Sequence, residues 1–198
     1  MRLSNKFTLT RVLFAPFFFL LYFIPIWSGK FAALSMFIAI PCLAFAEFTD
    51  YLDGHFARKR NEVSDFGKMF DPFADVVLHL TSFICFIKSF NPEISYMPLV
   101  ILMLIFIREF SQNFLRMVAA KKGVAVAARK GGKFKTVMYV VAEFYAVFLE
   151  LLVRTDNLPD FFGGLKTASL VLFIICVICS YASFADYLVH FGKMLKDE

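Results

Sequence analysis

The chain has 198 residues, of which 60% are hydrophobic, and 28 of them are phenylalanine. So much apolar sequence is atypical of a soluble domain and predicts an integral membrane protein. The formal net charge is +5, but the sequence shows neither a soluble basic face nor a nucleic-acid recognition motif, which excludes a nucleic-acid-binding function.

Apolar stretches recur along the chain, and each is about the ~20 residues that cross a ~30 Å hydrocarbon core. They cover roughly 7–27, 31–53, 70–90, 95–118, 134–153 and 165–191. Arg11 and Pro16 interrupt the first stretch, which argues against a cleaved signal peptide. We therefore expect an all-α integral membrane protein, with residues 1–198 forming one domain and six transmembrane helices in one bundle.

Lysine and arginine are distributed unevenly between the two expected sides. Most of them fall in the segments 2–11, 58–68, 121–135 and 193–196, whereas the other side has Lys30, Lys88, Arg154 and Lys166. The positive-inside rule then places both termini in the cytoplasm, as expected for a multi-pass protein of the cell (inner) membrane. Lys121, Lys122 and Lys130 fit a simple interfacial role.

Four aspartates lie within or beside apolar sequence in the middle of the chain: Asp50, Asp53, Asp71 and Asp75. Placing one carboxylate at the centre of a membrane helix costs roughly 2.5–3.5 kcal/mol of insertion free energy, so four of them together indicate a functional site. We expect one helix to end at Asn61 and the next to be capped by Ser64. The inner pair then lies ~11 Å and the outer pair ~16 Å from the turn on both arms, so the hairpin brings all four together near the cytoplasmic surface.

Four hard oxygen donors suit Mg²⁺ or Mn²⁺ better than zinc, and they can hold two such ions. Two ions can clamp a diphosphate and stabilise charge on the attacking and leaving oxygens. Gly54 and Ala57 let a ligand approach the helix, and Arg58 can pair with a phosphate. An acidic cluster paired with Arg58 and Lys68 only for packing is the weaker alternative. We expect a polar active-site cavity that is open to the cytoplasmic side.

The pattern D-x2-D-G-x2-A-R-x8-G-x3-D-x3-D runs from Asp50 through Gly67 to Asp75. All eight fixed positions are met, and in this the chain resembles the CDP-alcohol phosphotransferase family. Further segments are most similar to its phosphatidylglycerophosphate synthase group, among them Asn5–Arg11, Asp65–Lys68, Phe70–Asp75, Arg108–Glu109 and Gly132–Thr136.

The resemblance implies transfer of a phosphatidyl group from CDP-diacylglycerol to sn-glycerol 3-phosphate, giving phosphatidylglycerophosphate and CMP. It implies that the four aspartates are ligands of two Mg²⁺ or Mn²⁺ ions, that Asp75 is also the catalytic base, and that the protein is a homodimer of six-helix subunits. It assigns the nucleotide site to Asn5, Thr8, Gly54, Ala57, Arg58 and Ser64. One departure is Val76, where many members of this group have lysine.

Glycerol 3-phosphate carries a phosphate monoester, and a site for it needs clustered cations. Arg108 and Arg116 are eight residues apart, so they share a helix face, and Lys133 and Lys135 begin the next helix. We assign these four residues to the acceptor site and expect Glu109 to order Arg108.

Other acceptors remain open as alternatives: phosphatidylglycerol, as in a cardiolipin synthase, inositol phosphate or serine. A divalent-cation transporter is a further alternative from a different class. Away from the motif, Glu47, Glu143 and Asp186 are expected to pack or pair, and His79 and His190 look like ordinary buried or interfacial histidines. The four cysteines fall in apolar stretches and fit simple packing.

Overall fold

The computed structural model describes residues 3–60, 65–124 and 130–192; for 3–7, 50–60, 65–66, 68 and 130 it describes the backbone path alone. The described chain is all-helical, as predicted, and contains six long helices and no strand. They are α1 (Leu3–Ser28), α2 (Ala32–Arg60), α3 (Asp65–Cys85), α4 (Leu99–Lys121), α5 (Lys130–Arg154) and α6 (Phe162–Phe191).

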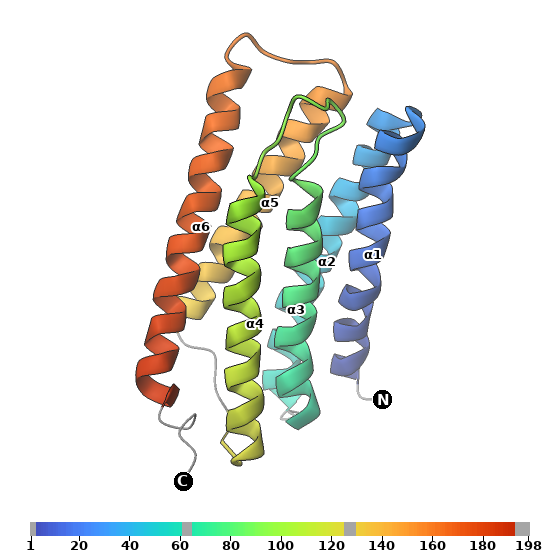
Figure 1. The fold of residues 1–198 in the computed structure, drawn as a ribbon. Coiled ribbons are helices and arrows are strands. Elements are labelled where there is room, and N and C mark those ends of the chain that lie inside the picture. The colour runs from blue at the N-terminus through green and yellow to red at the C-terminus, as the bar shows by residue number, and fades with distance from the viewer. Residues whose placement is uncertain (1–2, 61–64, 125–129, 193–198) are drawn as a thin grey trace.

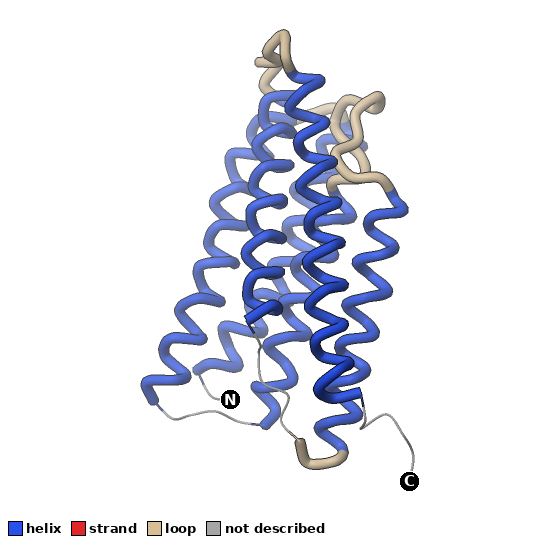
Figure 2. Tube along the Cα trace, turned by 90° about the vertical axis from the view of Figure 1, so that its left-hand side faces the viewer, coloured by secondary structure: helices blue, strands red, loops and turns tan. Residues whose placement is uncertain are grey.

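The helices run up and down along one common direction (Figures 1 and 2). The first residues of α1 and the last residues of α6 lie at the same end of the bundle, which we call the terminal end (Figure 1). The end of α2 and the beginning of α3 also lie there, whereas the segments 29–31, 86–98 and 155–161 lie at the opposite end. The helical arms that carry the acidic motif therefore lie at the same end as the beginning of α1 and the end of α6 (Figure 1).

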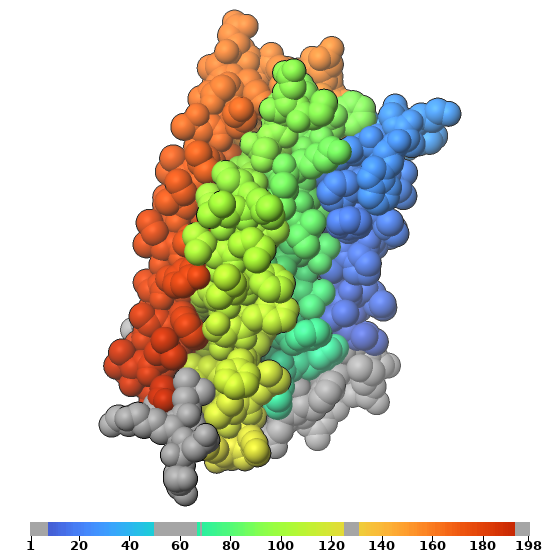
Figure 3. Space-filling model, viewed as in Figure 1, coloured from blue at the N-terminus to red at the C-terminus, as the bar shows by residue number. Residues whose placement is uncertain are grey.

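Helix α3 lies between α1 and α4 in the packing order of the bundle (Figure 3). Helix α1 packs on α2 and α3, α3 also contacts α4 and α5, and α6 packs on α5 and α4. Figure 3 shows α1, α3, α4 and α6 side by side on one face. The main core contains large aromatic side chains from several helices, including Phe18, Tyr22, Phe83, Tyr139 and Phe173.

The outer surface of the bundle is apolar. Large hydrophobic side chains are exposed on every helix, among them Leu13, Phe37, Phe73, Phe110, Phe148 and Ile178. By length and composition, four described segments could cross a membrane: Thr8–Ser28, Ala32–Thr49, Gly131–Arg154 and Phe162–Phe191. Helices α3 and α4 are not among them, and both carry charged residues at the positions assigned to the site, such as Asp71, Asp75 and Arg108.

Helix bounds differ from the predicted apolar stretches around the third and fourth helices. Helix α3 ends at Cys85 and α4 begins at Leu99, so residues 86–98 form a longer connection than predicted. Pro98 stands directly before α4, and proline lacks the N–H that a helix interior requires. The connection folds back on itself, since the backbone N–H groups of Tyr96 and Met97 both donate to the carbonyl of Phe86.

A buried ion pair fastens this connection to the bundle. The Glu150 carboxylate accepts hydrogen bonds from Ser89 Oγ at 2.6 Å, Tyr96 Oη at 2.8 Å and Arg154 Nε at 2.6 Å. Arg154 also donates to Ser35 Oγ and to the Tyr22 carbonyl, both at 2.8 Å. One pair on α5 thus joins α1, α2 and the 86–98 connection.

Loss of this arginine should weaken the fold rather than the chemistry. Arg154→Ala leaves the Glu150 carboxylate buried without its cation, and breaking a buried pair in this way costs about 3–5 kcal/mol. We expect a markedly lower unfolding temperature in detergent. Lys166→Ala, at an exposed position of α6, serves as the control and should leave that temperature unchanged. Equal stability of the two variants would contradict this role for the pair.

Candidate active site

A buried arginine on α1 holds the two aspartates of α3. Arg11 is 1% exposed, and its guanidinium contacts the Asp75 carboxylate directly and lies 3.8 Å from that of Asp71. Thr8, one turn earlier on α1, donates its hydroxyl hydrogen to Asp71. The predicted placement of Asp71 and Asp75 on one helix face is therefore confirmed, because a single side chain contacts both.

The two carboxylates themselves are accessible. The Asp71 side chain is 38% exposed and that of Asp75 34% exposed, although Arg11 behind them is buried. Two all-oxygen ligands one helical turn apart fit a hard divalent cation such as Mg²⁺ or Mn²⁺. The Arg11 guanidinium offsets part of the repulsion between the two like charges.

The other half of the motif lies on the last turns of α2. Asp50, Asp53, Gly54, Ala57 and Arg58 all follow the helical path that ends at Arg60, but their side chains lie outside the described part of the structure. The same holds for the side chain of Asn5 on α1, and Ser64 lies outside the described residues altogether. Gly67 is buried in the first turn of α3. Helix α1 packs on both α2 and α3, the two helices that carry the motif.

Arg11 is a site residue that the sequence analysis did not assign. There it interrupted the first apolar stretch, counted among the charges that set the orientation and ended the segment Asn5–Arg11 of the family resemblance, but it received no role in the site. A stronger signal was present, because an arginine inside a membrane-length apolar segment usually has a partner carboxylate. What the sequence did not give was the identity of that partner, which is more than sixty positions away.

Two residues assigned to the acceptor site meet at a single carboxylate. Glu109 Oε1 accepts hydrogen bonds from Arg108 at 2.8 Å, from Lys135 Nζ at 2.8 Å and from Tyr139 Oη at 2.9 Å. Arg108 also donates through Nε to the carbonyl of Ser180 on α6. The expected ordering of Arg108 by Glu109 is confirmed, and this cluster joins α4, α5 and α6.

The other two acceptor residues lie apart from this cluster. Arg116 is half-buried, with its guanidinium 5.9 Å from the ring centre of Tyr187, and Lys133 is exposed at the beginning of α5. Between Arg108 and Arg116 on α4 lies Gln112, which is 2% exposed. Neither polar atom of its amide has a hydrogen-bond partner within the described part of the chain. The sequence analysis did not single out Gln112, whose position on the face shared by the two arginines was its only signal.

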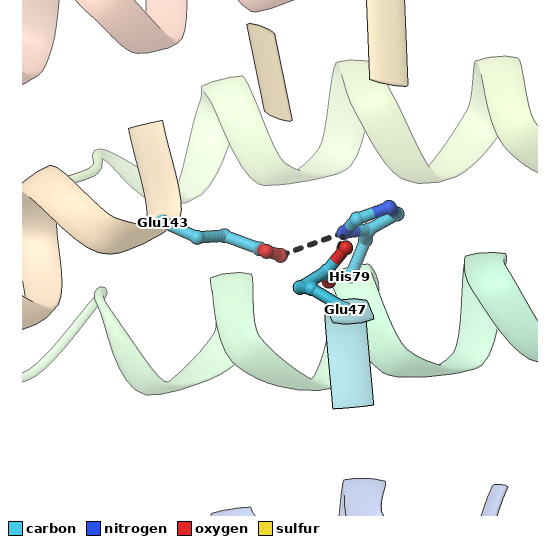
Figure 4. Close-up of side chains that lie close together, drawn as sticks. All are labelled: Glu47, His79 and Glu143. Atoms are coloured by element: carbon cyan, nitrogen blue, oxygen red, sulfur yellow. Dashed lines mark hydrogen bonds and ion pairs between the residues drawn. The ribbon is translucent and has the colours of Figure 1, made fainter. Parts of the chain in front are cut away.

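A third polar cluster lies inside the bundle, where Glu47, His79 and Glu143 point toward one another from three helices (Figure 4). His79 Nδ1 lies 2.9 Å from Glu143 Oε1 and 3.8 Å from Glu47 Oε1. The expectation that these two acids pair is confirmed. His190 also pairs, lying 3.3 Å from Asp186 on the surface of α6.

Comparisons with known proteins agree with the motif. The sequence profile of the CDP-alcohol phosphatidyltransferase family matches residues 1–182. A CDP-diacylglycerol–glycerol-3-phosphate 3-phosphatidyltransferase of Treponema pallidum is 32% identical over 209 residues, covering 99% of this chain and 92% of that protein. Proteins of the same name are 36% identical in Bacillus subtilis (71% of this chain, 73% of that protein) and 28% identical in Haemophilus influenzae (96% and 94%). Together with the aspartates that Arg11 holds on α3, the match over nearly the whole length shows that the chain belongs to the CDP-alcohol phosphatidyltransferase family.

Proposed function

We propose that this enzyme transfers the phosphatidyl group of CDP-diacylglycerol to sn-glycerol 3-phosphate, forming phosphatidylglycerophosphate and CMP. The observation that carries the proposal is the pair of accessible carboxylates, Asp71 and Asp75, which Arg11 and Thr8 hold at the end of the complete family motif. The names of the relatives in Treponema, Bacillus and Haemophilus support the same donor and acceptor.

The proposed reaction needs a base beside the attacking hydroxyl. Asp75 takes the proton from the 1-hydroxyl of glycerol 3-phosphate, whose oxygen forms a bond to the phosphorus of the phosphatidyl group. The bond from that phosphorus to the CMP oxygen breaks, and CMP leaves. When bound by Asp50, Asp53, Asp71 and Asp75, two Mg²⁺ or Mn²⁺ ions would neutralise the diphosphate and acidify the hydroxyl.

The chain's other residues position the two substrates. We assign the nucleotide and diphosphate to Asn5, Thr8, Gly54, Ala57, Arg58 and Ser64. Among them, the Thr8 hydroxyl donates to Asp71 and so orients a proposed metal ligand. Arg11 is buried behind the carboxylates, and we assign it to holding them rather than to contacting substrate.

The acceptor phosphate fits the region between α4, α5 and α6. Arg108 and Lys135 supply two cations against the one carboxylate of Glu109, and Arg116, further along α4 and apart from this cluster, adds a third for a phosphate monoester. Glu109 fixes the directions of Arg108 and Lys135 through hydrogen bonds to one oxygen. Lys133 lies at the exposed end of α5 and completes the assigned set.

We place the enzyme in the cell (inner) membrane as a single domain over residues 1–198. All six helices span the bilayer in this proposal, with both termini and the site cavity on the cytoplasmic side, and two subunits form a homodimer. The apolar outer surface and the position of the acidic hairpin at the terminal end support this orientation. Ion pairs of Asp75 with Arg11 and of Arg108 with Glu109 lower the cost of placing these charged residues of α3 and α4 in a membrane.

An acceptor panel tests the proposed function. The purified enzyme is given CDP-diacylglycerol with Mg²⁺ or Mn²⁺ and either glycerol 3-phosphate, phosphatidylglycerol, inositol phosphate or serine, and CMP release is measured. We expect CMP release to be at least tenfold faster with glycerol 3-phosphate than with the other acceptors. An acceptor that loses one charged contact with the site loses more than about 1.4 kcal/mol, which corresponds to a factor of ten. Faster CMP release with another acceptor would show that glycerol 3-phosphate is not the preferred acceptor. Ion uptake into liposomes without CMP release would favour a transporter.

Arg116→Ala is the cleanest test of the acceptor site. Unlike Arg108 and Lys135, Arg116 makes no ion pair with Glu109, so its removal leaves no buried carboxylate uncompensated. We expect KM for glycerol 3-phosphate to rise roughly 10–100-fold, the effect of losing one charge-assisted contact of about 1.5–3 kcal/mol. KM for CDP-diacylglycerol should change little. Lys121→Ala, at the exposed end of α4, is the control, and equal losses for both substrates would refute the assignment.

A further inference from the structure

The cluster of Glu47, His79 and Glu143 has the geometry of a metal site. Each residue offers one ligand atom, and these three atoms all lie within 4.8 Å of one another. They come from α2, α3 and α5, three helices that converge in the interior (Figure 4). Three ligands from three separate helices can surround a point, which ligands from a single helix face cannot do.

One carboxylate oxygen at this point is left without a partner. Glu143 is 0% exposed, and although its Oε1 is hydrogen-bonded to His79, its Oε2 has no hydrogen-bond partner within the described part of the chain. A buried carboxylate oxygen that lacks a partner carries a desolvation cost that a cation would remove. The unpartnered oxygen belongs to a side chain directed into the cluster, so it indicates a ligand there.

The charges of the three groups also call for a cation. Two carboxylates face one imidazole, and even a protonated His79 balances only one of them. Burying charge in the interior of a bundle is costly unless it is paired, and a divalent ion pairs with both acids at once.

We propose that Glu47, His79 and Glu143 bind a divalent transition-metal ion, with zinc the best fit, at a site separate from the aspartates of the motif. An imidazole nitrogen with two carboxylate oxygens is a donor set that zinc accepts, whereas Mg²⁺ prefers oxygen alone. Tetrahedral zinc would bring the ligand atoms to roughly 3.3 Å apart, a small contraction reached by side-chain rotation. The fourth position is open to water or another ligand.

The position of the site suggests what the ion does. Glu47 lies three residues before Asp50 on α2, and His79 lies four residues after Asp75 on α3. A metal bound here ties α5 to both arms of the acidic hairpin, one turn deeper in the bundle than the motif. It therefore fixes the spacing of the arms without contacting the substrates.

Zinc content tests the site on the intact protein, purified in detergent and equilibrated with Zn²⁺ and a large excess of Mg²⁺. We expect one zinc per chain in the wild type and in Asp71→Asn. His79→Asn and Glu143→Gln should each lose it, whereas His190→Asn, at the exposed pair on α6, should keep it. Glu143→Gln preserves the shape of the side chain, so it remains informative if His79→Asn fails to fold.

Spectroscopy identifies the ligands independently of stoichiometry. Co²⁺ in place of zinc should show the strong visible absorption of a four-coordinate ion, and Cu²⁺ in the same site should give an electron-spin resonance signal with coupling to one imidazole nitrogen. Both signals should disappear in Glu143→Gln and His79→Asn. Absence of bound zinc in the wild type, or unchanged zinc content in those two variants, would overturn the proposal. Glu47, His79 and Glu143 would then form only a buried ion-paired cluster. Neither readout requires transferase activity, so failure of the proposed reaction would be recognised separately.

Discussion

Asp71→Asn is expected to abolish phosphatidyl transfer while leaving the protein folded. The substitution keeps the size of the side chain and its ability to accept the Thr8 hydrogen bond, but it removes the negative charge that a divalent ion requires. Loss of this electrostatic contribution should lower CMP release by roughly 10²–10³-fold or more. The measurement is CMP release at saturating CDP-diacylglycerol across a titration of Mg²⁺ or Mn²⁺.

The control for Asp71 is Asp160→Asn, in the exposed segment 155–161 at the opposite end of the bundle. It should retain wild-type activity and the same metal dependence. Size-exclusion profiles and unfolding temperatures of the two variants should agree. Full turnover of Asp71→Asn in the presence of EDTA would contradict the metal assignment.

Asp75→Asn is expected to separate binding from chemistry. Three carboxylates of the motif remain for the ions, so CDP-diacylglycerol should still bind, but the variant cannot accept the proton of the acceptor hydroxyl. CMP release should fall by roughly 10²–10⁴-fold, the usual contribution of a general base. Binding of the nucleotide lipid and CMP release are measured on the same preparation.

If Asp75→Asn loses both CDP-diacylglycerol binding and CMP release, Asp75 is a metal ligand only. The base would then have to be found elsewhere, and the first residue to replace is His55, which directly follows Gly54 at a variable position of the motif. In this variant Arg11 loses the negative charge of one of the two carboxylates that it contacts, while its ion pair with Asp71 remains. Glu93→Gln, exposed in the 86–98 connection, is the matched neutral substitution and should retain both binding and release.

The sequence predicted the helices better than their ends. Six apolar stretches of membrane length became six helices, because apolar length is a property of each segment alone. The connection 86–98 was predicted less well, since Tyr96 and Met97 are as apolar as a helix core. The Tyr96 hydroxyl donates to the distant Glu150, which pairs with Arg154, and no local pattern reveals a contact of that kind.

The site shows the same difference between features that a single segment determines and contacts between distant helices. The aspartates followed from a fixed spacing within one hairpin, and their common helix face is confirmed at Asp71 and Asp75. Arg11, Gln112 and the triad of Glu47, His79 and Glu143 depend on contacts between distant helices. Sequence showed that each was a polar residue in an apolar segment, but only the fold showed which partner it has.

The contact between Arg11 and the aspartates of α3 has a consequence for how the chain enters a bilayer. Taken alone, α3 is not among the segments apolar enough to cross, since Asp71 and Asp75 oppose partition into lipid. In the proposed six-span arrangement, α1 is synthesised before α3, so Arg11 can supply the positive charge that Asp71 and Asp75 pair with when α3 inserts. If all six helices span the membrane as proposed, insertion of α3 depends on α1, and Arg11→Ala should lower the membrane-integrated fraction of the expressed protein.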